Sequence, residues 1–198
     1  MLDVIKKASL QLVQKGSIVA SSTVTTESIL ESNSVCFFVI RRPGWQLCRE
    51  EALDIAQMFK SRASLFSNVS LIGIIKEVAP LKNVATDKEL GVEDFQENYF
   101  LNFPVYIDSE KTFYKALGNK SLLSQKLSTW NPFQLYSDFK SLGNRLKAKN
   151  INGNLVGEGL IKGGIIVVSK NKGVVASFPE ETGSLLPLER IEEAIKNV

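Results

Sequence analysis

The sequence predicts an α/β fold in which a central mixed β-sheet is flanked by helices. A continuous apolar run over residues 35–40, β-branched and aromatic, is typical of a central strand that is covered on both faces, and residues 69–78 are expected to form a second buried strand. Between them, residues 45–62 place apolar side chains at three- and four-residue spacing, which is typical of a helix with one buried face. Strand, helix and strand in this order predict a right-handed, parallel βαβ unit.

The elements after this unit alternate between short helices, one short strand and loops. Helices are expected over 92–99, 111–117 and 132–149, a strand over 105–108, and irregular structure over 80–89, 119–131 and the glycine-rich stretch 152–164.

The chain then returns to the sheet as a β-hairpin and closes with a helix. Residues 165–169 and 174–178 are the hairpin strands, joined by a turn that ends in glycine. Pro187 stands near the start of the last predicted helix, over 188–196, where proline is well tolerated.

Residues 1–33 are expected to be an N-terminal helix and extension, and residues 34–198 the main domain. Apolar residues in the first fourteen positions are interrupted by Asp3 and two lysines, so the core of a secretory signal is missing. A short amphipathic helix is the favoured interpretation of this segment, and a mitochondrial targeting segment stays open as the alternative.

Composition excludes several kinds of chemistry. The 198 residues contain no histidine, which removes Ser-His and Cys-His catalysis and the commonest zinc ligand. The two cysteines, Cys36 and Cys48, are too few for a disulfide-stabilised secreted domain, so we expect a reducing, cytoplasmic location. No apolar run is long enough to span a membrane. We also expect no metal, no cofactor and no nucleic-acid partner.

The predicted order of elements is that of the thioredoxin fold, with a helical insertion before the C-terminal hairpin. Three stretches carry a closer resemblance: RRPGWQLCREEA at 41–52, the segment 106–118, and the glycine-rich segment 153–168. Together they resemble the peroxiredoxin-like 2 family, within the alkyl hydroperoxide reductase/thiol-specific antioxidant group. The resemblance covers residues 34–196 and implies a redox-regulatory or antioxidant role.

That resemblance also implies a pair of cysteines, of which this chain has only the second. Members of the family typically read R-x-x-G-C-x-x-C at the strand–helix junction, whereas this chain has Trp45 at the first cysteine position and keeps Cys48 at the second. The first sulfur, at the positive end of the helix dipole, attacks, and the second closes the disulfide. Cys36 cannot replace it, because the strand sets it roughly 16 Å from the junction and a disulfide needs Cα atoms within roughly 7 Å.

Two hypotheses for Cys48 stay open. As a one-cysteine redox thiol it would need an external thiol, such as glutathione or thioredoxin, to resolve a sulfenate. As the first residue of the apolar helix stripe it would be structural, and the protein an inactive family member that works as a binding or regulatory module. Reduction of a lipid endoperoxide depends most on the dithiol, so Trp45 argues most strongly against that activity.

Arginines and an indole surround this candidate site. Arg41 and Arg42 are candidates for binding an anion beside the helix N-terminus. The alternative is a surface ion pair with Glu50 or Glu51. Trp45 either packs over the helix start or stacks on a ligand.

Glycines are expected where thioredoxins carry a cis-proline. Gly163 and Gly164 would face the junction through their backbone, because glycine has no Cβ. Asp108 and Glu158 are isolated carboxylates, and neither is assigned as a general base.

Overall fold

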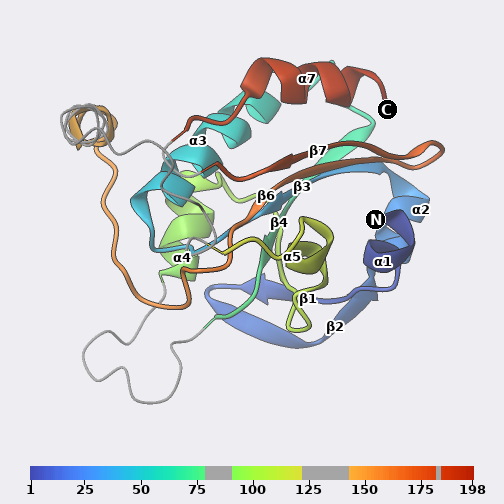
Figure 1. The fold of residues 1–198 in the computed structure, drawn as a ribbon, viewed down its shortest axis with the longest axis horizontal. Helices are drawn as coiled ribbons and strands as arrows, with labels where there is room; N and C mark the ends of the chain where they lie inside the picture. The colour runs from blue at the N-terminus through green and yellow to red at the C-terminus, as the bar shows by residue number, and fades with distance from the viewer. Residues whose placement is uncertain (79–90, 122–142, 182–183) are drawn as a thin grey trace.

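A computed structural model describes residues 1–78, 91–121, 143–181 and 184–198. Its centre is a seven-stranded mixed sheet in the order β2-β1-β5-β4-β3-β6-β7 (Figure 1). The strands are β1 (Ser9–Gln14), β2 (Ser17–Thr25), β3 (Ser34–Val39), β4 (Val69–Ile75), β5 (Val105–Ile107), β6 (Gly164–Ser169) and β7 (Gly173–Pro179). The predicted class, a thioredoxin-like sheet flanked by helices, is confirmed.

The predicted βαβ unit forms the middle of this sheet. Strands β3 and β4 are parallel, with Ser34 opposite Val69, and α3 (Gln46–Ser61) connects them. Every residue of β3 is buried, as expected for a strand covered on both faces. Strand β5 continues the parallel part beside β4.

The C-terminal hairpin also forms as predicted. Strand β6 runs antiparallel to β3 and pairs with β7 across a tight turn. The last helix, α7 (Leu188–Lys196), begins directly after Pro187 and buries Ile191, Ala194 and Ile195.

The prediction of one helix over residues 1–14 is wrong beyond its first half. Helix α1 covers Leu2–Lys6, and a β-hairpin of β1 and β2 follows before α2 (Thr26–Ser32). The two-residue connection Lys15-Gly16 has positive φ at both positions, 48° and 69°, the requirement of a type I′ hairpin turn. Because β1 pairs with β5, the hairpin extends the central sheet.

Helices cover both faces of the sheet (Figure 1). One core lies beneath α3, α7 and the helical segment formed by α4 (Val92–Asp94) and the π-helical η1 (Phe95–Tyr99). The other lies beneath α1, α2 and α5 (Thr112–Ala116).

Several predicted elements fall partly outside the described residues. The loop over 80–89 lies entirely outside, as do most of 119–131 and the first part of the helix predicted over 132–149; residues 143–148 of that helix are helical. None of the described helices has the length and apolar character that crossing a membrane requires.

Candidate functional site

The candidate site is the junction between β3 and α3, which we define as residues 40–45. It lies at the carboxyl end of the parallel strands, where α/β sheets commonly present functional groups. Trp45 is the N-cap residue of α3, and its side chain makes no capping hydrogen bond.

Every carbonyl from residue 40 to 44 accepts a hydrogen bond. The Arg42 carbonyl accepts one from the backbone N–H of Trp45 at 3.1 Å. Three more of these carbonyls accept from side chains: Tyr114 in α5, Lys76 directly after β4, and Arg49 in the first turn of α3. These pairs are Tyr114 Oη with Ile40 O at 2.7 Å, Lys76 Nζ with Arg41 O, and Arg49 Nε with Pro43 O at 3.0 Å. The backbone of the junction is thus fixed from several directions.

The glycine-rich stretch 151–163 covers the junction. Its Asn154 N–H donates to the carbonyl of Gly44 at 2.7 Å. Arg42 Nη1 donates to the carbonyl of Leu155 at 2.8 Å, so this half-buried guanidinium is bonded within the chain. The stretch predicted as a structured loop is therefore a cover over the start of α3.

Arg41 is buried and paired inside the protein. Only 3 % of the residue is exposed, and its Nη1 lies 3.2 Å from Glu180 Oε1. Its guanidinium also lies against the Trp45 indole, 3.1 Å from the ring centroid, in a cation–π contact. The alternative of a surface ion pair with Glu50 or Glu51 is thus wrong for Arg41, because Glu180 supplies the opposite charge in the interior.

Glu50 pairs elsewhere. It is 1 % exposed and accepts two hydrogen bonds from Arg145, at 2.8 and 2.9 Å, with Lys149 at 3.1 Å. This network joins α3 to the helical residues 143–148. A buried carboxylate requires such cationic partners.

Cys48 points into the core beneath the junction. It is 1 % exposed, and burial raises the pKa of its thiol to about 12. The nearby carboxylates of Glu51 and Glu180 raise this pKa further, whereas Arg41 and a backbone hydrogen bond from Arg42 lower it in part. The thiol is therefore protonated at neutral pH and shielded from solvent.

Cys36 is a buried apolar residue of β3. It has no exposed surface, and burial raises the pKa of its thiol strongly. It lies in the sheet opposite Leu71 and Val167, away from the carboxyl end of the strand. Both cysteines are free thiols.

Glu51 shares the environment of Cys48, one helical turn further along α3. Burial raises the pKa of Glu51 to about 8; Glu180 adds to this effect and Arg41 opposes it. At neutral pH the side chain is mainly a neutral carboxylic acid. From the sequence, Glu51 is predicted only as a surface ion-pair partner.

Glu158 and Asp108 have structural partners. Glu158 pairs with Lys76 at 3.0 Å, and it accepts backbone hydrogen bonds from Leu160 and Ile161. Asp108 Oδ2 accepts from the N–H of Phe113 at 2.8 Å, and burial raises the pKa of Asp108.

The two glycines predicted to face the junction lie in different places. A Cβ on Gly163 would overlap the carbonyl oxygen of Val39 and come within 3.1 Å of the Arg41 nitrogen, so this backbone packs directly against the junction. Gly164 instead packs against β7, beside Phe178 and Pro179. No cis peptide bond occurs in the described ranges.

Sequence reasoning missed Glu180, Lys76 and Tyr114. Lys76 ends an otherwise apolar run, which is a weak signal of a buried charge. Glu180 is far from the junction in sequence and lies in no motif, and Tyr114 lies in the segment 106–118 that carries the resemblance, which does not indicate a contact with the junction. Among the residues that the structure describes, no three Cys, Asp or Glu side chains are grouped to hold a metal ion.

Comparison with known proteins places this geometry in context. The family model described as AhpC/TSA antioxidant enzyme matches residues 63–182, C-terminal to the junction. Peroxiredoxin-like 2A of Homo sapiens is 31% identical over 180 residues, covering 89% of this chain and 69% of the relative. Prostamide/prostaglandin F synthase of Salmo salar is 29% identical over 179 residues, covering 89% and 82%.

Solved structures agree on the fold. Peroxiredoxin Q of Xanthomonas campestris superimposes with a TM-score of 0.59 at 11% identity, covering 98% of this chain and 93% of that one. AhpC of Enterococcus faecalis gives a TM-score of 0.57 at 11% identity, covering 98% and 91%. At this identity the likeness concerns the fold alone.

Proposed function

Because this chain belongs to the AhpC/TSA antioxidant enzyme family, we propose that it is a redox-regulatory member that no longer carries out thiol catalysis and works as a binding or regulatory module. The observation that supports this proposal is the state of Cys48. It is the only cysteine of α3, and it is buried and protonated beneath a junction whose carbonyls are all bonded.

The chemistry of the family needs a sulfur that meets its substrate. In peroxide reduction a thiolate attacks the O–O bond, becomes a sulfenate and releases an alcohol or water. Trp45 stands where the resemblance implies the attacking cysteine, and its indole lies on the buried Arg41 guanidinium. In this arrangement no sulfur of the junction is open to a peroxide.

A one-cysteine cycle at Cys48 is the second candidate. Two features favour it: Arg41 and the Arg42 backbone N–H both stabilise the thiolate of Cys48. Such a cycle would need an external thiol as reductant, and the buried thiol of Cys48 would have to become exposed to the peroxide.

Peroxide turnover tests the two candidates against each other. We expect wild type and Cys48→Ser to consume hydrogen peroxide at the same background rate with glutathione or thioredoxin as reductant. Turnover by wild type that Cys48→Ser abolishes would overturn the proposal and establish the one-cysteine cycle.

Trp45→Cys and Trp45→Ser form a matched pair that tests the role of the indole. Both remove the ring, and only the first adds a sulfur at the helix N-terminus, where a thiol pKa is lowered. We expect peroxide consumption in Trp45→Cys alone. Activity in Trp45→Ser would contradict this expectation, because Cys48 would then react once the indole is gone.

A further inference from the structure

The glycine-rich cover, residues 151–163, carries an exposed Asn-Gly dipeptide beside the junction. Asn152-Gly153 is the only Asn-Gly pair in the sequence. Both residues are exposed, and they lie outside helices and strands. Asparagine is labile in front of glycine, because glycine has no Cβ to hinder attack of its nitrogen on the asparagine side chain. The dipeptide therefore combines the sequence and the solvent access that deamidation requires.

The backbone on both sides of the dipeptide is hydrogen-bonded to the junction and to the first turn of α3. Three donors make these bonds: Gln46 Nε2 to Ile151 O at 2.9 Å, Arg49 Nη1 to Asn152 O at 2.9 Å, and the Asn154 N–H to Gly44 O at 2.7 Å. Consecutive residues of the cover thus face fixed partners. An extra backbone atom between residues 151 and 154 would put these bonds out of register.

Buried side chains anchor the cover to the core that contains Cys48. Ile151 and Val156 are each 4 % exposed and belong to the same apolar cluster as Cys48. Between them, a Cβ on Gly153 would lie 2.7 Å from the carbonyl oxygen of Gly44, so the glycine packs directly on the junction. The dipeptide is therefore the exposed part of a cover that is otherwise held at the protein surface by its neighbours.

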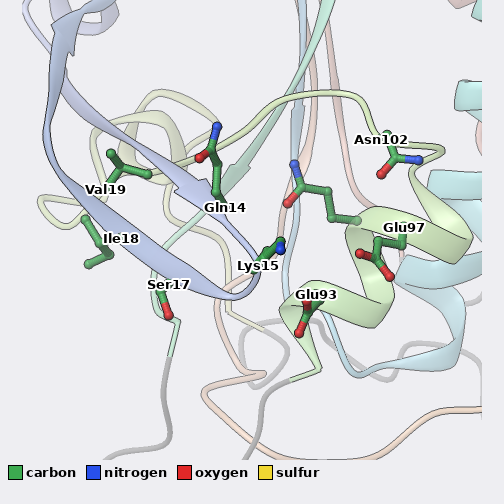
Figure 2. A pocket seen from close by; sticks show the side chains of 9 residues that line it. Gln14, Lys15, Ser17, Ile18, Val19, Glu93, Glu97 and Asn102 are labelled. Atoms are coloured by element: carbon green, nitrogen blue, oxygen red, sulfur yellow. The ribbon is translucent and has the colours of Figure 1, made fainter.

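Arg49 connects the dipeptide to the rest of the site. Its buried guanidinium also donates to the Pro43 carbonyl at 3.0 Å and pairs with Asp94 at 2.8 Å. Asp94 belongs to the α4–η1 segment, which Figure 2 shows with Glu93. The hollow of about 580 Å³ between this segment and the β1–β2 turn is lined by exposed or half-buried side chains and takes no part in the modification (Figure 2). A change at Asn152 thus reaches the junction through Arg49.

We propose that Asn152 is a modification site, where deamidation to isoaspartate lengthens the backbone, releases the cover from the junction and exposes Cys48. In the first step the Gly153 nitrogen gives its proton to solvent and attacks the side-chain carbonyl carbon of Asn152. The new C–N bond closes a cyclic imide, the bond to the side-chain nitrogen breaks, and that nitrogen leaves as ammonia. Water then adds to one imide carbonyl and opens the ring, and no electrons are transferred.

The two ways of opening the ring give different backbones. Opening at one carbonyl gives aspartate, which keeps the ordinary main chain and adds a carboxylate beside Arg49. Opening at the other gives isoaspartate, whose main chain passes through the side-chain carbons and is longer by one C–C bond, about 1.5 Å. Only the second product shifts the hydrogen bonds of residues 151–154. The inference goes beyond the proposed function, because it concerns the cover whether or not Cys48 reacts with peroxide.

Incubation of the full chain in mildly alkaline buffer tests the modification. Peptide mass spectrometry locates the deamidated residue, and methyl transfer by an isoaspartyl methyltransferase counts the isoaspartate. We expect isoaspartate at residue 152 and an intact Asn154, which precedes leucine and whose Oδ1 accepts the Val156 N–H at 2.9 Å. Asn152→Gln keeps an amide on a longer side chain that closes the corresponding ring far more slowly, so this variant should stay unmodified.

The alkylation rate of Cys48, measured in the Cys36→Ser background, tests the consequence. Incubated protein should show a fast phase, at least about tenfold above the fresh rate, whose amplitude matches its isoaspartate content. Asn152→Gln after the same incubation should react like fresh protein. Asn152→Asp copies the new charge without the longer backbone, so it should react within about twofold of fresh protein.

The inference is overturned if residue 152 stays intact, if Asn154 is modified as fast, or if the modified chain is alkylated like fresh protein. Full acceleration in Asn152→Asp would also overturn it, because the charge alone would then release the cover. Fresh protein in which Cys48 reacts like a free thiol overturns the proposed function, whereas the isoaspartate content at residue 152 tests the modification separately.

Discussion

The buried pair of Arg41 and Glu180 should contribute strongly to stability, and Glu180→Gln tests this. The two charges lie 3.2 Å apart with almost no exposure of either side chain. Removing one partner of a buried pair leaves the other charge uncompensated and typically costs about 3–5 kcal/mol. Glutamine keeps an oxygen for the Gly163 N–H, which donates to Glu180 at 3.0 Å. The cost should therefore lie near the low end, about 3 kcal/mol.

For a chain of 198 residues this loss corresponds to a fall in Tm of about 6–12 °C. Urea unfolding, followed by Trp fluorescence and by circular dichroism, gives the free energy of unfolding directly. A double-mutant cycle that combines Glu180→Gln with Arg41→Met separates the interaction energy of the Arg41–Glu180 pair from the other effects of each substitution. Because both variants break the same interaction, the double variant should lose at least about 1 kcal/mol less than the sum of the single variants.

The same variant has a second readout at the sulfur. Glu180 raises the pKa of Cys48, so Glu180→Gln should lower that pKa and speed alkylation of the thiol. A variant that unfolds within about 1 kcal/mol of wild type, or a cycle that is strictly additive, would refute a stabilising role for the pair.

Three further predictions are checked by urea unfolding. Gly163→Ala should cost at least about 3 kcal/mol, since its Cβ would overlap a main-chain carbonyl of β3. Gly143→Ala lies at the start of the 143–148 helix, where a Cβ would meet no atom within 4 Å among the described residues, and it should gain about 0.5–1 kcal/mol. Equal effects of the two glycine variants would contradict the close packing at Gly163. The folded-state pKa of Glu51, about 8, lies above its ordinary value, so wild-type stability should fall between pH 5 and pH 8. Because Glu51 is partly exposed, Glu51→Gln should reduce that fall in the free energy of unfolding by about 1–2 kcal/mol. Parallel plots of stability against pH for wild type and Glu51→Gln would refute this. Arg145→Met should cost about 2–3 kcal/mol, because the buried carboxylate of Glu50 then keeps only the Lys149 ammonium as its partner. The control Lys147→Met changes an exposed residue of the same helix and should leave the free energy of unfolding unchanged.

The centre of the fold was predictable because its signals are local. The run over 35–40 is apolar throughout, and the middle of 69–78 is apolar apart from one glycine, a composition that suits a strand covered on both faces. The N-terminal hairpin was not predictable in the same way. Its turn, Lys15-Gly16, lacks the asparagine or aspartate that usually marks a type I′ turn.

The site shows the same division. The inward orientation of the Cys48 side chain is predictable from its place at the start of the apolar stripe of the helix, and in the structure the residue is buried. The partner of Arg41 could not be predicted, because Glu180 reaches the junction only through the pairing of β3, β6 and β7. A tertiary contact of this kind leaves no periodic pattern in the sequence.

The alkylation rate of Cys48 as a function of pH tests the central claim most directly. In the Cys36→Ser variant Cys48 is the only thiol, and the same variant unfolded in urea supplies the reference. A pKa of about 12 against about 8.5 for a free thiol lowers the thiolate fraction at pH 7 about three-thousandfold. We predict a native rate at least that much slower, rising about tenfold per pH unit up to pH 9.5 without a plateau. A native rate within tenfold of the unfolded reference, or a plateau below pH 9, would show a reactive thiol and contradict the account.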